Sequence, residues 1–261
     1  MPQFEHYIGV DYSGAETPTS SLPGLRVYAA DWLIAPKEVQ PPTGSRKYWT
    51  RRSIAEWLRN ELSKPTPTIV GIDHGFSFPM RYFEAHRLPP DWPNFLDDFQ
   101  RHLPTDEGNT YVDFVREGVR GKGSKRAGDP AWLRLTESWT PSAKSVFLFD
   151  VQGSVAKSTH AGLPWLRFLR EQCGEHAHFW PFDGWEIPPG RSTVAEVYPS
   201  LWTRRFPNDN GRNPDQQAAY AVAAWLRRAD MDGSLVRFFS PPLEPRERTI
   251  AKVEGWILGV A

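Results

Sequence analysis

This 261-residue sequence has only one cysteine, no long apolar run and no excess of charge of either sign. The single cysteine, Cys173, excludes an intrachain disulfide and a cysteine-based zinc cluster, and it is typical of a reducing compartment. No stretch approaches the roughly 18 consecutive apolar residues of a membrane span, so we expect no membrane partner. The N-terminal "MPQFEHYIGVD" lacks the basic and apolar regions of a signal peptide, and we therefore expect a cytoplasmic protein.

The charges balance, with 31 Lys and Arg against 31 Asp and Glu. No overall field would therefore recruit nucleic acid, and binding to it would need a local patch. Nothing in the sequence indicates an oligomeric state.

Apolar residues make up 39% of the chain and include 12 Trp and 15 Phe, which is enough for a sizeable core. Strand-like and helix-like stretches alternate before residue 76 and again after residue 144. Residues 76–144 are instead rich in proline, aromatic and charged residues. We therefore predict one α/β domain over residues 1–261, a mixed sheet flanked by helices, with an insertion at 76–144 that holds only short helices near 95–103 and 111–118.

In the N-terminal part we predict strands at residues 6–12 and 25–35 that pair antiparallel. A helix over 53–62 follows, with Ser53 as N-cap and Glu56 completing a capping box. The apolar "TIVGID" (68–73) then predicts a buried strand parallel to the first, reached by the helical crossover.

In the C-terminal part Asn213 and Pro214 suit the start of a helix, as N-cap and first-turn residue. The predicted elements are strands at 145–151, 177–182 and 192–200, and helices at 162–172, 213–229 and 245–258.

Four acidic residues lie on predicted strands or at the start of a predicted helix. Asp11 and Asp73 end strands, Glu196 lies in "VAEVYP", and Asp215 opens a helix. Neighbouring strand ends lie about 5 Å apart, so carboxylates there repel one another unless a cation or protons lie between them. Carboxylate and water ligands favour Mg²⁺ or Mn²⁺, and such ions support phosphodiester hydrolysis.

Each acid also has a simpler interpretation. Asp11 alone is typical of a turn aspartate that bonds its own backbone. Glu196 could point outward from its strand, and Asp215 could simply stabilise the helix dipole. The presence of Asp73 beside Asp11 favours a site.

The motifs "GVDYSGA", "VGIDHGFSFP", "AEVYPSLW" and "DQQAAYAVAAWL" occur in the order seen in a known family. The chain resembles the ribonuclease H-like superfamily, in particular its RuvC-like branch of predicted nucleases. The resemblance implies a ribonuclease H-like fold and a divalent-metal-dependent nuclease acting on nucleic acid. It also implies catalytic roles for Asp11, Asp73, Glu196 and Asp215, with Asp11, Asp73 and Asp215 as ligands to Mg²⁺ or Mn²⁺.

One feature departs from the family pattern. The late helix often carries two aspartates a turn apart, whereas Asp215 is followed by Gln216, Gln217 and Ala218. The departure puts a second metal ion in doubt.

Further residues are candidates for contact with substrate. Lys157, in a predicted loop, would stabilise a transition state beside the acids. Lys125 and Arg126 belong to a basic, glycine-spaced stretch at 116–137 that would contact phosphates, although such a run is also typical of a solvated loop. Ser13 and His74 follow Asp11 and Asp73 closely, and we include them as substrate-binding candidates.

Two other functions remain open. The turns "DYSGAET" and "DHGFS" resemble the phosphate-binding turns of actin-like and sugar kinases, although only one copy of the core is evident. A catalytically degenerate ribonuclease H-like module that only binds its partner is the other alternative, because the second helix carboxylate is missing.

Overall fold

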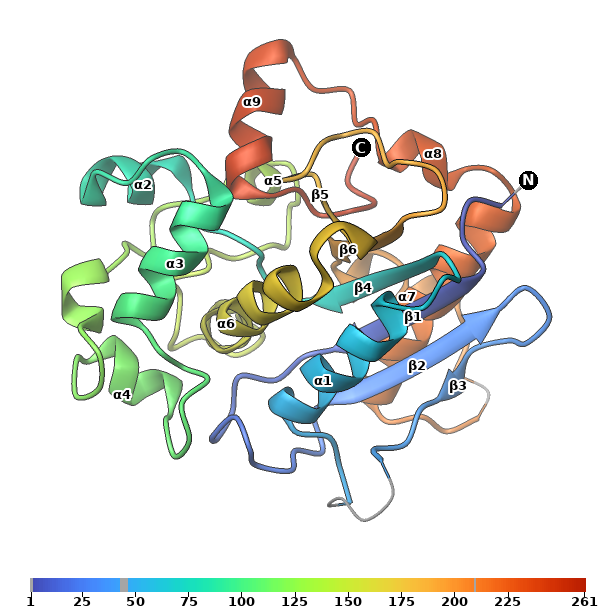
Figure 1. Ribbon diagram of the computed structural model, residues 1–261, viewed down its shortest axis with the longest axis horizontal. Coiled ribbons are helices and arrows are strands. Elements are labelled where there is room, and N and C mark those ends of the chain that lie inside the picture. The colour runs from blue at the N-terminus through green and yellow to red at the C-terminus, as the bar shows by residue number, and fades with distance from the viewer. Residues whose placement is uncertain (1, 43–46, 209) are drawn as a thin grey trace.

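A computed structural model describes residues 2–42, 47–208 and 210–261 (Figure 1). Within these residues one mixed sheet of six strands is flanked by helices, which confirms the predicted α/β class. The strand order is β3-β2-β1-β4-β6-β5. The strands are β1 (His6–Asp11), β2 (Arg26–Asp31), β3 (Lys37–Glu38), β4 (Thr68–Asp73), β5 (Ala177–Trp180) and β6 (Ser192–Glu196).

The pairing of the strands decides which ends meet. β1 pairs antiparallel with β2 and parallel with β4, and β6 lies parallel to both β4 and β5. The β1–β2 and β1–β4 pairings were predicted from the sequence. The carboxyl ends of β1, β4 and β6 therefore lie at the same edge of the sheet.

Both faces of the sheet are buried, and alternate strand residues supply them. Ile8, Val10, Val70 and Ile72 pack in one core with α1 (Arg51–Leu62) and α6 (Ala156–Cys173). The opposite face, including Tyr7 and Ile69, packs on α7 (Pro214–Met231). Figure 1 shows α1 and α6 in front of the sheet and α7 behind it.

α7 lies unusually close to β1, because Gly9 carries no side chain. A Cβ placed on Gly9 would lie 2.7 Å from the Ala223 backbone nitrogen and would also collide with the Ala219 carbonyl oxygen. The small residues of α7 thus bring its backbone onto the strand. As predicted, Asn213 caps this helix by accepting from the Gln216 N–H, and Pro214 fills the first turn.

α1 begins earlier than predicted. Its N-cap is Thr50, whose hydroxyl accepts from the Ser53 N–H at 3.0 Å, while the Ser53 hydroxyl accepts from the Thr50 N–H. The capping box therefore joins Thr50 and Ser53, and the predicted pair of Ser53 and Glu56 was wrong.

Between β4 and α6 the chain forms short helices and, across the described residues 74–155, no strand. The helices are α2 (Met80–His86), α3 (Trp92–His102), α4 (Val112–Arg116) and α5 (Leu135–Ser138). Phe78 packs against Phe95, Phe99 and Phe147 in the core that also contains the sheet residues. The segment therefore shares the core of the sheet.

The predicted strands at 25–35 and 192–200 end early, at Asp31 and Glu196. Three other predicted elements differ more from the structure. Residues 145–151 form turns and no strand, because Val146 and Phe147 insert separately into the core. α6 begins at Ala156, so Lys157 lies in its first turn and the predicted loop there was wrong. The last long helix, α9 (Pro245–Glu254), stops before Gly255, which takes a φ of 81°, whereas we predicted a helix to residue 258.

Short elements complete the described fold: α8 (Leu235–Phe238) follows α7, and four 3-10 helices connect other elements of the described residues. Among the described residues, no helix combines the length and apolar character that crossing a membrane requires.

Candidate functional site

Asp11 and Asp73 occupy equivalent positions at the ends of adjacent parallel strands. The β1–β4 register pairs Asp11 directly with Asp73, and the β4–β6 register pairs Ile72 with Glu196. Three acids predicted from the sequence are therefore brought to one edge of the sheet by parallel pairing alone.

Neither Asp11 nor Asp73 has a hydrogen-bond or ion-pair partner among the described residues. Burial, followed by the nearby Asp73 and Asp215 carboxylates, raises the pKa of Asp11 well above its usual value. Burial and the Glu196 carboxylate raise the pKa of Asp73 to about 7. Arg26 only partly counteracts the rise for Asp11, so charge at this edge would be relieved mainly by protonation or by a bound cation.

Asp215 approaches the pair from α7. Gly24, after the turn that follows β1, lies between Asp215 and Ser13: a Cβ on Gly24 would lie 3.7 Å from Asp215 Oδ2 and 3.6 Å from Ser13 Oγ. The start of α7 thus brings Asp215 near Gly24 and Ser13, beside the loop that leaves Asp11.

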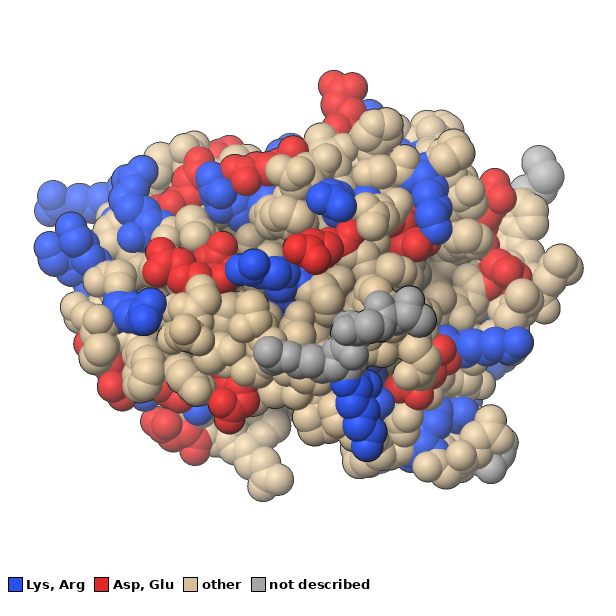
Figure 2. All heavy atoms as spheres, turned by 60° about the horizontal axis from the view of Figure 1, so that its bottom comes forward, with Lys and Arg blue, Asp and Glu red and all other residues tan. Residues whose placement is uncertain are grey.

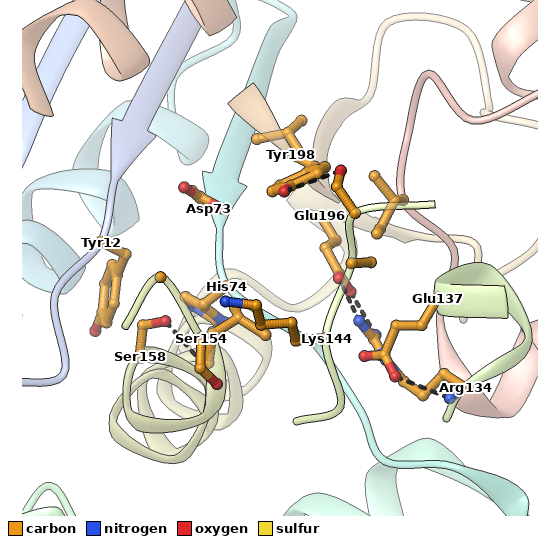
Figure 3. Close-up of a pocket in the computed structure, with 16 residues that line it drawn as sticks. Tyr12, Asp73, His74, Arg134, Glu137, Lys144, Ser154, Ser158, Glu196 and Tyr198 are labelled. Atoms are coloured by element: carbon orange, nitrogen blue, oxygen red, sulfur yellow. Dashed lines mark hydrogen bonds and ion pairs between the residues drawn. The ribbon is translucent and has the colours of Figure 1, made fainter. Parts of the chain in front are cut away.

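A cavity of about 200 Å³ opens beside β4 and β6 (Figure 3). Asp73, His74 and Glu196 line it, whereas Asp11 and Asp215 do not. Figure 3 shows the Asp73 carboxylate pointing toward the β1 side, while Glu196 points the other way, toward Arg134. The acids therefore form two groups, with Asp73 facing Asp11 and Glu196 facing an arginine.

Glu196 belongs to a buried ion network. Arg134, only 1% exposed, donates to both Glu196 oxygens at 2.6 and 2.7 Å and to Glu137 at 2.8 Å. The Phe76 N–H donates to Glu196 Oε2 at 3.0 Å. Glu196 Oε2 thus accepts two hydrogen bonds, one for each of its lone pairs. Oε1 accepts one from Arg134 and can accept one more.

His74 is a buried, neutral side chain. Burial lowers its pKa to about 4, and its Nδ1 lies 2.9 Å from the Gly75 carbonyl oxygen, which makes Nδ1 the donor. Its ring packs against Tyr12 at 4.6 Å between centroids. His74 therefore lines the cavity as predicted but is only 2% exposed.

A second hollow, of about 470 Å³, adjoins the first and shares Tyr12, Ser154 and Ser158 with it. Ser13 and Lys157 line it, so two predicted substrate-contacting residues share this hollow. Lys157 Nζ pairs with Asp113 at 2.9 Å, and both side chains are well exposed.

The loop after Asp11 is held by a buried arginine. Arg51, 0% exposed, donates to the carbonyl oxygens of Ser13, Ala15 and Glu16 at 3.2, 2.6 and 2.9 Å. Gly14 also meets the α6 backbone so closely that a Cβ there would lie 2.6 Å from the Ser158 nitrogen. The loop is therefore fixed between α1 and α6.

Lys125 and Arg126 are not brought to either cavity. Arg126 binds both Asp98 oxygens at 2.6 and 2.7 Å, which ties the segment to α3, and Lys125 is exposed. Figure 2 shows acidic and basic side chains interspersed over one face, with several Lys and Arg at its left end.

Sequence reasoning missed three residues of the site. Tyr12, whose hydroxyl is buried and has no partner among the described residues, was taken only as the end of a strand. Lys144 lines the cavity and donates to the Gln152 carbonyl at 2.7 Å. Arg134 was counted only as part of a basic run; the isolated charge within "WLRLTE" was the available signal.

The chemistry of Asp11, Asp73 and Asp215 suits a hard divalent cation, because unpaired carboxylate oxygens are the ligands that Mg²⁺ and Mn²⁺ prefer. The side chains as placed do not form a group of three or more His, Cys, Asp or Glu residues arranged to hold a metal, as far as the described residues extend.

Comparisons with protein-family models, with curated proteins and with solved structures found no match for this chain.

Proposed function

We propose that this protein is a divalent-metal-dependent phosphodiesterase that cleaves nucleic acid on a ribonuclease H-like fold. The proposal rests chiefly on the Asp11–Asp73 pair, two carboxylates in register that lack any partner among the described residues. A cation that binds both would offset their repulsion and the cost of their burial.

The order of the elements supports the ribonuclease H-like part of the proposal. An acid ends the first strand, an antiparallel pairing follows, α1 leads to a parallel strand that ends in a second acid, and a late helix opens with Asp215. This is the arrangement that the sequence motifs predict.

Asp11 and Asp73 would hold Mg²⁺ or Mn²⁺. Asp215, which lies near enough to raise the pKa of Asp11, would have to move closer to join them as a third ligand. When bound, such an ion would polarise a phosphodiester and make a bound water more acidic. Glu196, compensated by Arg134, would shape the cavity and accept one hydrogen bond through Oε1.

Two lysines near the start of α6 would contact phosphate. Lys144 lines the cavity that Asp73 also lines, and Lys157, in the first turn of α6, lines the adjoining hollow. Phosphate near the start of an 18-residue helix would also meet the positive end of its dipole.

The test is cleavage of labelled single-stranded DNA, double-stranded DNA and RNA with Mg²⁺, with Mn²⁺ or with a chelator. We expect cleavage only with metal, and a loss of at least about 100-fold for Asp11→Asn and Asp73→Asn, a size typical of removing a key electrostatic group. Glu56→Gln, which neutralises an exposed acid on α1, is the matched control and should cleave normally.

Other outcomes would favour the alternatives. Equal cleavage by Asp11→Asn and the unaltered chain would reject the mechanism. Thermal stabilisation by ATP would support a phosphotransferase, and nucleic-acid binding without metal-dependent cleavage would support a degenerate binding module.

A further inference from the structure

Two adjoining hollows follow the outer side of α7, on the face turned away from the sheet. One measures about 580 Å³ and the other about 250 Å³, and they share Phe206, Arg228 and Asp232. The first is bounded by the β2–β3 connection at Ala35 and Pro36, and the second by α8. We propose that this α7 groove binds single-stranded nucleic acid.

The arginines of the groove are available to an anion. Arg205, Arg228 and Arg237 are exposed, and within the described residues none has a hydrogen-bond or ion-pair partner for its guanidinium. A fourth, Arg227, donates to the carbonyl oxygens of Asp31 and Trp32 and keeps its full charge.

One acid offsets part of this charge. Asp232 is the single acid among the residues lining the two hollows, its Oδ1 accepts from the Ser234 N–H at 2.9 Å, and it interacts electrostatically with Arg228 and Arg237. The arginines of the two hollows nevertheless outnumber it. The α7 groove is therefore a local positive patch on a chain of zero net charge, which is the condition that nucleic-acid binding requires here.

Aromatic rings lie among the arginines. Phe206 and Phe238 are partly exposed in the groove. Behind them Trp225 stacks on Trp202 at 3.9 Å and meets Phe238 edge-on at 5.4 Å, which makes a rigid wall. Guanidinium groups beside exposed rings suit a strand whose phosphates are paired and whose unstacked bases lie on the rings.

The shape of the surface favours a single strand over other polyanions. A flat bilayer would contact protruding residues, whereas these arginines and rings line a hollow. A duplex is also disfavoured, because its paired and stacked bases expose no faces on which the rings could stack. Arg228 lies 13 residues after Asp215 on the same helix, about 20 Å along its axis. A strand held in the groove would thus run along α7 toward the edge that carries Asp215, whether or not that edge cleaves it.

Fluorescence anisotropy with a labelled 15-nucleotide oligothymidylate, in chelator and about 50 mM salt, tests the proposal without involving cleavage. The variant replaces Arg205, Arg228 and Arg237 by Gln. The matched control replaces Arg52, Arg81 and Arg246 by Gln. These arginines are also exposed but lie elsewhere, and within the described ranges no hydrogen bond or ion pair engages their guanidinium groups. Phe206→Leu tests stacking separately.

We expect the groove variant to bind at least 10-fold more weakly than the unaltered chain, with a salt dependence shallower by about 2 in logarithmic slope. Phe206→Leu should weaken binding by about 10-fold at unchanged slope, and the control should bind within about 2-fold of the unaltered chain. Absence of binding by the unaltered chain, or equal weakening in both triple variants, would overturn the proposal. So would tighter arginine-dependent binding to phosphatidylserine vesicles than to the oligonucleotide. None of these results bears on metal-dependent cleavage at Asp11 and Asp73, so failure here is distinguishable from failure of the proposed function.

Discussion

Asp11 and Asp73 are register partners at the ends of two adjacent parallel strands, and neither carboxylate has a partner among the described residues. Such an arrangement is unfavourable for folding unless something binds there, because two half-buried negative charges repel each other. Because the strand register places the two carboxylates together, a cation or protons would be required to offset their repulsion.

The first prediction concerns the pH dependence of stability. The pKa of Asp73 is raised from 3.8 to about 7, so the folded chain binds this proton more tightly than the unfolded chain does. Stability is therefore lost as pH rises from about 4 to 7, and it stays low above 7. Asp73→Asn removes this titration. In chelator, its free energy of unfolding should rise relative to the unaltered chain by up to about 4 kcal/mol between pH 4 and 8, an upper limit because Asp73 is partly exposed.

Urea unfolding at several pH values measures this difference. The pKa values of His74 and His160 are lowered to about 4, so both histidines destabilise the folded chain on acidification. They do so equally in the unaltered chain and in Asp73→Asn, and their effect therefore cancels in the difference. Glu56→Gln should show no such trend. A pH-independent difference for Asp73→Asn would show that Asp73 titrates normally.

The second prediction concerns the contact between α7 and β1. Gly9→Ala would force the α7 backbone away from the strand, because the new Cβ meets backbone atoms of Ala219 and Ala223. We expect a loss of about 3 kcal/mol in the free energy of unfolding. Gly108→Ala, where a Cβ meets nothing within 4 Å, should change stability by less than about 0.5 kcal/mol. Similar values for the two variants would contradict the described packing.

The third prediction concerns Arg134. Arg134→Met leaves Glu137 and Glu196 buried without their cationic partner, which typically costs about 3–5 kcal/mol. Arg246→Met is the control and should be nearly neutral, because Arg246 is exposed and forms no ion pair with any residue that the structure describes. Chemical denaturation measures both, and an Arg134 variant as stable as its control would show that the network carries little energy.

Apolar runs and capping residues in the sequence correctly predicted the central strands and the start of α7. The apolar runs ending in Asp11 and Asp73 became parallel strands, and Asn213–Pro214 opened α7. The same reasoning failed at residues 145–151, since an apolar run does not reveal whether its side chains enter a sheet or, like Phe147, an aromatic cluster. Ser53 was also predicted to be the N-cap of α1, but the helix begins earlier and the Thr50 hydroxyl accepts from the Ser53 N–H.

The ion pairs of the site and of the insertion could not be predicted, because their partners lie far apart in the sequence. Arg126 meets Asp98 across 28 residues, and Arg134 meets Glu196 across 62. Only the folded path of the insertion brings these charges together, so the sequence could not separate structural arginines from those free to bind phosphate. Lys144 and Tyr12 were missed because nothing in their neighbours marks a cavity wall.

The most direct test of the central claim is a crystal structure of the protein soaked in Mn²⁺, with the ion located by its anomalous scattering. The account predicts a peak bonded to a carboxylate oxygen of Asp11 and to one of Asp73, and its disappearance in crystals of Asp11→Asn. Manganese found only elsewhere, or two protonated carboxyls bonded to each other with no ion between them, would contradict it.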